Sequence, residues 1–201
     1  MSGVTATWRE DEYVPSADKT AAADAAIDAL RERGSPAHDG LAARLVGHRL
    51  VGDRLELELQ PMRWSLRLVA GDASNAVAAT CITRDSEGRW LAGRRAPWVA
   101  SWAGRWALGA AGAVDVGENP ADTLARELRE EWSVEAERMT VEALVHLPQR
   151  LVMVVGTAWL AEGAEVIPDH EHDTHAWWPA DPADWPPEGD EPLRRLAELV
   201  Q

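Results

Sequence analysis

The chain has 201 residues, which is enough for one domain of good size or for a core domain with an N-terminal extension. Hydrophobic residues make up 46% and charged residues 27%, and this globular composition excludes a chain that is disordered throughout. The net charge of −14 argues against a nucleic-acid or anionic-membrane partner, because binding to a polyanion needs a surplus of Lys and Arg. An anionic substrate would need local help from a metal or from a few arginines.

The single cysteine, Cys81, excludes an internal disulfide framework and suits a reducing compartment. Residues 1–19 lack the apolar core of a secretory signal, and no run of about 18 apolar residues follows. We therefore expect a cytoplasmic protein that does not span a membrane.

The N-terminal region begins with a predicted helix over residues 17–33. Ser16 is suited to cap its first turn, and the Gly-Ser-Pro at 34–36 is a stop signal. Alternating leucines then predict a strand at 55–59, which a Gly52-Asp53 turn separates from the residues before it.

A second alternating run predicts another strand at 64–68, beyond Pro61. Residues 1–72 are thus predicted to form a helix-plus-strand extension, and the polar link at 71–75 precedes a second domain at 73–201. The extension could be a dimerisation element, which would make the protein a homodimer, or a lid over a site.

From residue 76 onward strands and helices alternate. The predicted strands cover 76–84, 89–95, 105–112, 139–147 and 150–161, with a turn at 85–88 and a Trp- and Gly-rich loop at 96–104. An acidic, His-rich loop is expected at 168–175, followed by a short apolar stretch at 176–178 and a last helix near 190–200.

A further helix is predicted over residues 120–132, where Asn119 is suited to the N-cap and Pro120 to the first helical position. On a helical wheel its apolar residues form one stripe facing the core, made of Ala121, Leu124, Ala125, Leu128 and Trp132. The three glutamates Glu127, Glu130 and Glu131 group on one flank of that stripe.

Carboxylates grouped in this way repel one another by a few tenths of a kcal/mol per pair. A hard cation with oxygen ligands removes the repulsion, and Mg²⁺ commonly binds through carboxylates together with substrate phosphate oxygens. A solvated acidic face is the alternative interpretation of the helix taken by itself.

The longer spacing favours the metal site. Gly112 is followed by Glu118, then by Arg126-Glu127-Leu128, Glu130-Glu131 and Val134, in an order that resembles the Nudix box. One position departs from the family pattern, because Ser133 stands where the late glycine belongs. A serine there should cost about 1 kcal/mol if the helix ends in a left-handed conformation.

The resemblance implies an α/β fold, the Nudix-type α/β/α sandwich with a mixed sheet, here preceded by the N-terminal helix and β-meander. It also implies a Nudix pyrophosphohydrolase that cleaves the diphosphate bond of a small molecule, such as a nucleoside diphosphate linked to another moiety. The implied cofactor is Mg²⁺ or Mn²⁺. Its implied ligands are Glu127, Glu130 and Glu131, with the carbonyl of Ala111 as an additional one.

Other roles follow from the same resemblance. Gly112, Glu118 and Arg126 would be structural members of the box, with Arg126 paired to a carboxylate such as Glu118. The general base would be Glu130 or Glu131, or an acid on a distant loop, for which Glu171 is the candidate. His170, His172 and His175 offer a competing metal-like cluster, and solvated histidines are the alternative.

Four residues near the box are candidates for substrate binding. They are Arg94, Arg95, Arg105 and Trp106. The arginines could bind phosphate oxygens and a tryptophan could stack on a nucleobase, whereas surface arginines and core packing are the alternatives.

Two other functions remain open at this stage. An enzyme resembling isopentenyl-diphosphate isomerase shares the box but needs a catalytic cysteine, and Cys81 lies in the middle of a predicted strand. A non-catalytic diphosphate-binding sensor would keep the fold without turnover, although the intact glutamates argue against it.

Overall fold

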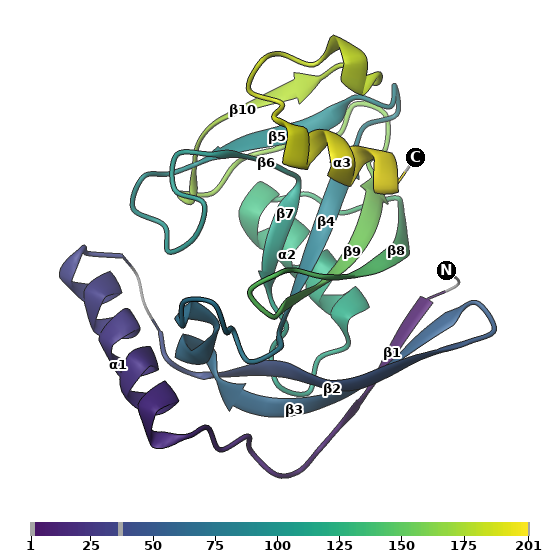
Figure 1. Cartoon of the computed structure of the whole chain (residues 1–201). Helices are drawn as coiled ribbons and strands as arrows, with labels where there is room; N and C mark the ends of the chain where they lie inside the picture. The colour runs from purple at the N-terminus through teal and green to yellow at the C-terminus, as the bar shows by residue number, and fades with distance from the viewer. Residues whose placement is uncertain (1–2, 36–37, 201) are drawn as a thin grey trace.

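The computed structural model describes residues 3–35 and 38–200, and within these ranges ten strands form one mixed sheet (Figure 1). The strands are β1 (Gly3–Trp8), β2 (Leu41–Val51), β3 (Arg54–Arg63), β4 (Ala76–Arg84), β5 (Trp90–Arg95), β6 (Trp106–Leu108), β7 (Ala110–Ala113), β8 (Arg138–His146), β9 (Leu151–Trp159) and β10 (His172–Trp178). The helices are α1 (Ala17–Glu32), α2 (Pro120–Trp132) and α3 (Glu191–Leu199), with short 3₁₀ turns η1 (Trp64–Leu68) and η2 (Pro182–Asp184).

The sheet runs in the order β1-β3-β2-β4-β5-β10, and β4 also pairs with β7 and, in parallel, with β9. β2 meets β4 where Arg44 lies opposite Ala76, and it bridges to the segment after β7 where Ala42 lies opposite Asp115. The N-terminal strands are therefore continuous with the rest of the sheet.

Helices cover both faces of the central strands. On one face, α2 buries Leu124, Leu128 and Trp132 completely against β4 and β9. On the other face, α3 places Leu193 and Ala197 in a second core cluster. This is the expected α/β/α arrangement with a mixed sheet. Within the described ranges, no helix combines the length and the apolar character needed to cross a membrane.

Several predicted elements are confirmed. Ser16 caps α1 by accepting a hydrogen bond from the backbone N–H of Lys19, and α2 has the predicted bounds with Asn119 as its cap. The β2–β3 hairpin turns at Gly52, which has a φ of 64°. Pro36, part of the stop signal predicted after α1, lies outside the described residues.

The strand predicted at 64–68 is wrong, because these residues form η1. The alternation of large residues does not distinguish a strand from a single 3₁₀ turn. Asp39 decides the outcome: its carboxylate accepts a hydrogen bond from the N–H of Ser65 and binds Arg63, which folds the chain back at the end of β3. Pro61 is tolerated inside β3 because β1 has already ended opposite Leu59.

Two further boundaries differ from the prediction. The strand predicted at 105–112 is divided at Gly109, whose φ is 64° and where a Cβ would lie 1.9 Å from the carbonyl oxygen of Cys81. β6 therefore pairs with β5, while β7 pairs with β4. The His-rich loop ends at Glu171, because His172 and the residues after it pair with β5 as β10.

α2 ends in the left-handed conformation that its missing glycine would favour. Ser133 has a φ of 53° and a ψ of 32°, and its N–H donates to the carbonyl of Arg129. A left-handed residue with a Cβ is strained by about 1 kcal/mol relative to glycine. Ser133 thus retains the family's backbone geometry at the expense of some stability.

We expect Ser133→Gly to raise the free energy of unfolding by about 1 kcal/mol, because it removes this strain. Chemical denaturation of the purified protein measures the change. Ser133→Ala is the control, since alanine keeps the Cβ, and it should give no gain. Equal stability of the two variants would contradict the account.

Candidate active site

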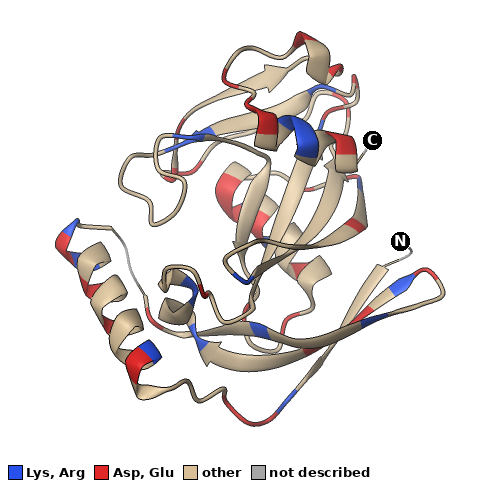
Figure 2. Cartoon of the chain, in the orientation of Figure 1, with Lys and Arg blue, Asp and Glu red and all other residues tan. Residues whose placement is uncertain are grey.

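The three glutamates of the acidic flank lie on the C-terminal half of α2. Glu127 and Glu131 are buried, with 8% and 5% of their surfaces exposed, whereas the side chain of Glu130 is 59% exposed. Figure 2 shows this acidic segment of α2 and the basic segment of β5 as neighbouring red and blue bands. Burial of two carboxylates on one helix requires compensation from groups around them.

Arg126 supplies part of that compensation. Its guanidinium donates to both carboxylate oxygens of Glu118, at 2.9 and 3.1 Å, and to the carbonyl of Ala113. It also binds Glu127 at 2.6 Å and Glu130 at 3.0 Å. The pairing of Arg126 with Glu118 that we expected is present, and the same guanidinium fastens the loop before α2 to β7.

These contacts perturb both partners. Hydrogen bonding to Glu118 raises the pKa of Arg126, so this guanidinium stays charged. Burial works to raise the pKa of Glu118, but hydrogen bonds from Arg126 and Thr123 bring it below its ordinary value. Glu118 is therefore an ionised structural anchor.

Gly112 lies directly against Glu127. A Cβ at Gly112 would fall 1.8 Å from a carboxylate oxygen of Glu127, so only glycine leaves room for that side chain beside β7. The box glycine and the first glutamate of the acidic flank are thus coupled by a steric requirement.

The side chain of Glu131, on α2, also contacts β7. Its Oε1 accepts a long hydrogen bond, 3.4 Å, from the N–H of Ala111, while its buried Oε2 has no partner. In an extended strand the N–H and C=O of one residue point to the same edge, so the carbonyl of Ala111 faces the side on which Glu131 lies. An unpaired buried oxygen beside a carbonyl is an environment that suits a cation.

Burial dominates the titration of both buried glutamates. Desolvation raises the pKa of Glu127 to about 7, against the attraction of Arg126. Desolvation also raises the pKa of Glu131 well above its ordinary value, with Arg95 acting in the opposite direction. Each carboxylate is therefore short of positive charge in the metal-free protein.

Arg95 and Glu171 complete this side of the site. The guanidinium of Arg95 binds Glu171 at 2.9 Å and lies 3.8 Å from Glu131. The N–H of Ala96 donates to the carbonyl of Glu171, which ties the His-rich loop to the end of β5. The charge of Glu171 also acts on Glu127 and Glu131. Glu171, although distant in sequence, therefore lies beside the box glutamates.

The three histidines do not form a metal cluster. The ring of His170 stacks on Trp98 with centroids 5.1 Å apart, and that of His175 meets the edge of Trp132. The Nδ1 of His172 is 3.2 Å from Asp169, whereas its buried Nε2 lacks a hydrogen-bond partner and lies 3.9 Å from the unpaired oxygen of Glu131. Burial lowers the pKa of His172, so its ring stays neutral.

Three of the four predicted substrate-binding residues lie elsewhere. Arg94 and Trp106 are opposite each other in the β5–β6 pair and so point to one face. Trp106 packs in the core cluster below α3, and Arg94 binds Asp173 at 2.8 Å. The guanidinium of Arg105 is 2.7 Å from Asp190, at the start of α3. Alternation along β5 separates Arg94 from Arg95, and only Arg95 reaches the glutamates.

One residue at the site carries no sequence signal of its own. Asp169 donates its N–H to the carbonyl of Glu131 and so satisfies the end of α2. Its position in the acidic, His-rich loop does not mark it, because only the folded chain brings it to α2.

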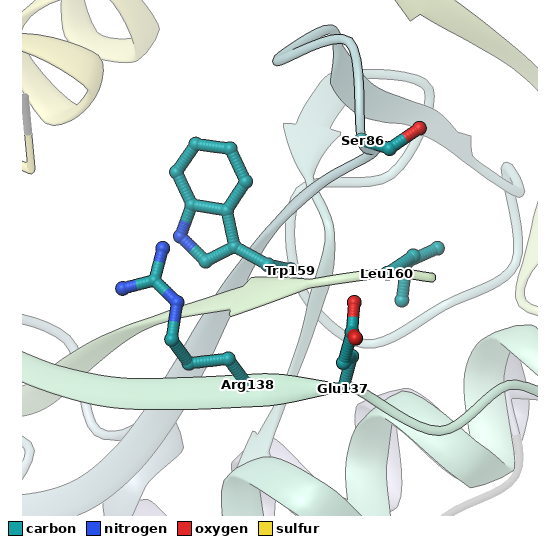
Figure 3. A pocket seen from close by; sticks show the side chains of 5 residues that line it. All are labelled: Ser86, Glu137, Arg138, Trp159 and Leu160. Carbon is teal, nitrogen blue, oxygen red and sulfur yellow. The ribbon is translucent and has the colours of Figure 1, made fainter. Parts of the chain in front are cut away.

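Among the described residues, no three acidic, His or Cys side chains converge as a preformed metal site. The guanidinium of Arg126 instead binds two of the three glutamates. A surface hollow of about 490 Å³ lies elsewhere, lined by Ser86, Glu137, Arg138, Trp159 and Leu160 (Figure 3). It contains none of the box acids.

The comparison with protein families decides the classification, because the model of the NUDIX domain matches residues 74–200. The chain belongs to the NUDIX family. Its enzyme class is that of the Nudix pyrophosphohydrolases. Residues Gly112 to Val134 are accordingly its Nudix box.

Solved structures agree with the Nudix assignment. The MutT NUDIX hydrolase from Burkholderia pseudomallei is 27% identical over 63% of this chain and 98% of its own, with a TM-score of 0.51. A Deinococcus radiodurans protein shares the fold at 18% identity over 63% of this chain and 83% of its own, with a TM-score of 0.50.

A third similar structure, a MutT/nudix family protein from Enterococcus faecalis, is 21% identical with a TM-score of 0.43. That match covers 51% of this chain and 43% of the Enterococcus chain, so it spans less than half of that relative's length. No curated protein matches the sequence.

The raised pKa of Glu127 predicts a pH-dependent stability of the metal-free Nudix domain. The carboxyl has a pKa of about 7 when folded and its ordinary, lower value when unfolded, so the folded state binds more protons between these values. Stability should fall as the pH rises through this window. Glu127→Gln, which stays neutral, should gain up to about 3 kcal/mol over wild type between pH 5 and pH 8.

Thermal and denaturant unfolding in EDTA at both pH values measures this difference. Glu135→Gln is the control, because the side chain of Glu135 is 80% exposed, and it should show the same difference from wild type at both pH values. A Glu127→Gln difference that does not change with pH would contradict the assignment.

Proposed function

We propose that this protein hydrolyses the diphosphate bond of a small molecule, such as a nucleoside diphosphate linked to another moiety, with Mg²⁺ or Mn²⁺ as its cofactor. The observation that carries the proposal is the buried, unpaired Oε2 of Glu131 beside the carboxylates of Glu127 and Glu130. Such a group of oxygens requires positive charge that the chain itself only partly supplies.

The residues present fit a divalent cation. Glu127, Glu130 and Glu131 would hold it, with the carbonyl of Ala111 as a further ligand. When bound, the ion would supply positive charge against the leaving phosphate and lower the pKa of a water molecule. Arg126 would then keep its bonds to Glu118 and Ala113, which are independent of the acidic flank.

Three carboxylates could accept the proton of the attacking water: Glu130, Glu131 and Glu171. We favour Glu171, because Arg95 positions it beside the box while its side chain remains 37% exposed. Glu131, by contrast, is buried against β7 and is better placed as a ligand.

Cys81 supports hydrolysis over isomerisation. Its thiol is completely buried in β4, and burial raises its pKa to about 12. The reactive form of a catalytic cysteine is the thiolate, which this environment disfavours.

The proposed setting follows from charge and composition. The net charge of −14 favours a small-molecule partner over a nucleic acid or an anionic membrane. With a single cysteine, a reducing cytoplasm is the location that we expect. A homodimer, with residues 1–72 as its dimerisation element, stays a prediction.

We expect a panel of diphosphates incubated with Mg²⁺ to contain at least one substrate. The panel should span nucleoside triphosphates, nucleotide sugars and dinucleoside polyphosphates. Glu131→Gln should lower turnover by at least about a hundredfold, because it removes a ligand or a base. EDTA should abolish turnover. Phosphate release and product chromatography measure both effects.

Glu135→Gln is the matched control on an exposed glutamate and should leave turnover unchanged. Turnover that survives both EDTA and Glu131→Gln would overturn the proposed chemistry. Tight binding of one diphosphate without turnover of any would favour the sensor instead.

A further inference from the structure

His172 and Glu131 place two polar atoms side by side that the protein leaves without hydrogen-bond partners. Within residues 3–35 and 38–200, neither the Nε2 of His172 nor the Oε2 of Glu131 has such a partner, and the two atoms lie 3.9 Å apart. Both side chains are buried, with 1% and 6% of their surfaces exposed. Unpaired buried polar atoms are uncommon in folded proteins, so two of them side by side indicate a ligand that they share.

The imidazole of His172 is held in place from three sides. His172 belongs to β10, which lies along β5 (Figure 1). A Cβ at Gly93 of β5 would fall 2.6 Å from the Cδ2 of His172, so the ring occupies the space that this glycine leaves. The ring of Trp132 packs against it with centroids 4.6 Å apart, and Asp169 lies 3.2 Å from its Nδ1. The position of Nε2 is therefore fixed by the fold.

The contact with Asp169 decides which nitrogen of the ring carries the proton. The Oδ1 of Asp169 also accepts a hydrogen bond from the N–H of Glu171, as a carboxylate oxygen does. The Nδ1 of His172 is accordingly the donor to this oxygen. In the neutral ring, Nε2 then has a lone pair and no hydrogen. Two electron-rich atoms thus lie next to each other in a buried place.

The chain itself does not satisfy this pair of atoms. Arg95 lies 3.8 Å from the other oxygen of Glu131, Oε1, which also accepts the N–H of Ala111. A proton between Nε2 and Oε2 cannot bind both, because 3.9 Å exceeds the length of a hydrogen bond. A divalent ion lies about 2.0–2.2 Å from a nitrogen or carboxylate ligand, and twice that distance is enough to span the two atoms.

We propose that the Nε2 of His172 is a nitrogen ligand of the divalent cofactor, bound together with the Oε2 of Glu131, and that it makes the site select Mn²⁺ over Mg²⁺. This inference rests on the proposed function and deepens it, because it adds a ligand from outside the Nudix box and narrows the choice of cofactor. Mg²⁺ prefers oxygen ligands, whereas a nitrogen ligand strengthens the binding of first-row transition ions. The remaining ligands are those already proposed, from α2 and β7.

Pulsed electron paramagnetic resonance of the full-length protein, loaded with Mn²⁺ alone, tests this ligand directly. Hyperfine coupling to a nitrogen nucleus reports a nitrogen bound to the ion, whether or not substrate turns over. Wild type should show this coupling. His172→Asn should lose it, because asparagine keeps an N–H near Asp169 but has no atom at the place of Nε2. His172→Gln, which is closer to histidine in volume, should lose it as well.

The affinity for each ion is a second measurement on the same proteins. The resonance of free Mn²⁺ gives the Kd for Mn²⁺, and displacement of Mn²⁺ by Mg²⁺ gives the Kd for Mg²⁺. His172→Asn should weaken Mn²⁺ binding by at least about tenfold and Mg²⁺ binding by less than about threefold. Equal weakening of both ions would mean that His172 only positions Glu131, and the proposed ligand would be wrong.

His175→Asn is the matched control. The ring of His175 also contacts Trp132, with centroids 5.8 Å apart, but His175 is exposed on β10. This variant should keep the nitrogen coupling and both affinities of wild type. Unfolding curves recorded in EDTA show which variants are folded.

Mn²⁺ bound to wild type without nitrogen coupling, while diphosphate turnover depends on metal, would overturn the role of His172 and leave the proposed function standing. This result needs no variant, so it does not depend on whether the substituted proteins fold. Turnover with Mg²⁺ by a protein that fails to bind Mn²⁺ has the same meaning. Failure of wild type both to bind either ion and to hydrolyse any diphosphate would overturn the proposed function, and the ligand with it.

Discussion

Arg126 holds together the parts of the chain from which the site is built. One guanidinium binds Glu118 in the loop before α2, Ala113 at the end of β7, and Glu127 and Glu130 on α2 itself. Carboxylates placed so close together would otherwise repel one another and push the helix from the strand. The rest of the site depends on this contact, because it brings the acidic flank of α2 up against the sheet.

The site that results leaves a buried carboxylate only partly compensated. Glu131 has one buried oxygen without a hydrogen-bond partner, and Arg95 lies 3.8 Å from its other oxygen. In the proposed function a divalent cation would satisfy the first oxygen. An uncompensated buried charge in the ligand-free protein favours binding of a ligand that compensates it.

The N-terminal segment and the Nudix domain share one sheet and one core. Val4 and Leu57 lie in the same buried cluster as Leu124 and Trp132 of α2. The segment is therefore fixed relative to the box by shared core packing and by strand pairing.

The sequence by itself determined the features that depend on local spacing: α1 with its Ser16 cap, α2 with its bounds, and the flank of glutamates from Glu127 to Glu131. Helical periodicity and capping are properties of neighbouring residues, so they can be read without a fold. The tertiary structure alone decided which distant residues join that flank. Alternation along β5 aimed Arg95 at the glutamates and Arg94 away from them, and the pairing of β10 with β5 brought Glu171 beside Arg95. Those outcomes rest on strand pairing and register between segments far apart in the chain, which no local pattern encodes.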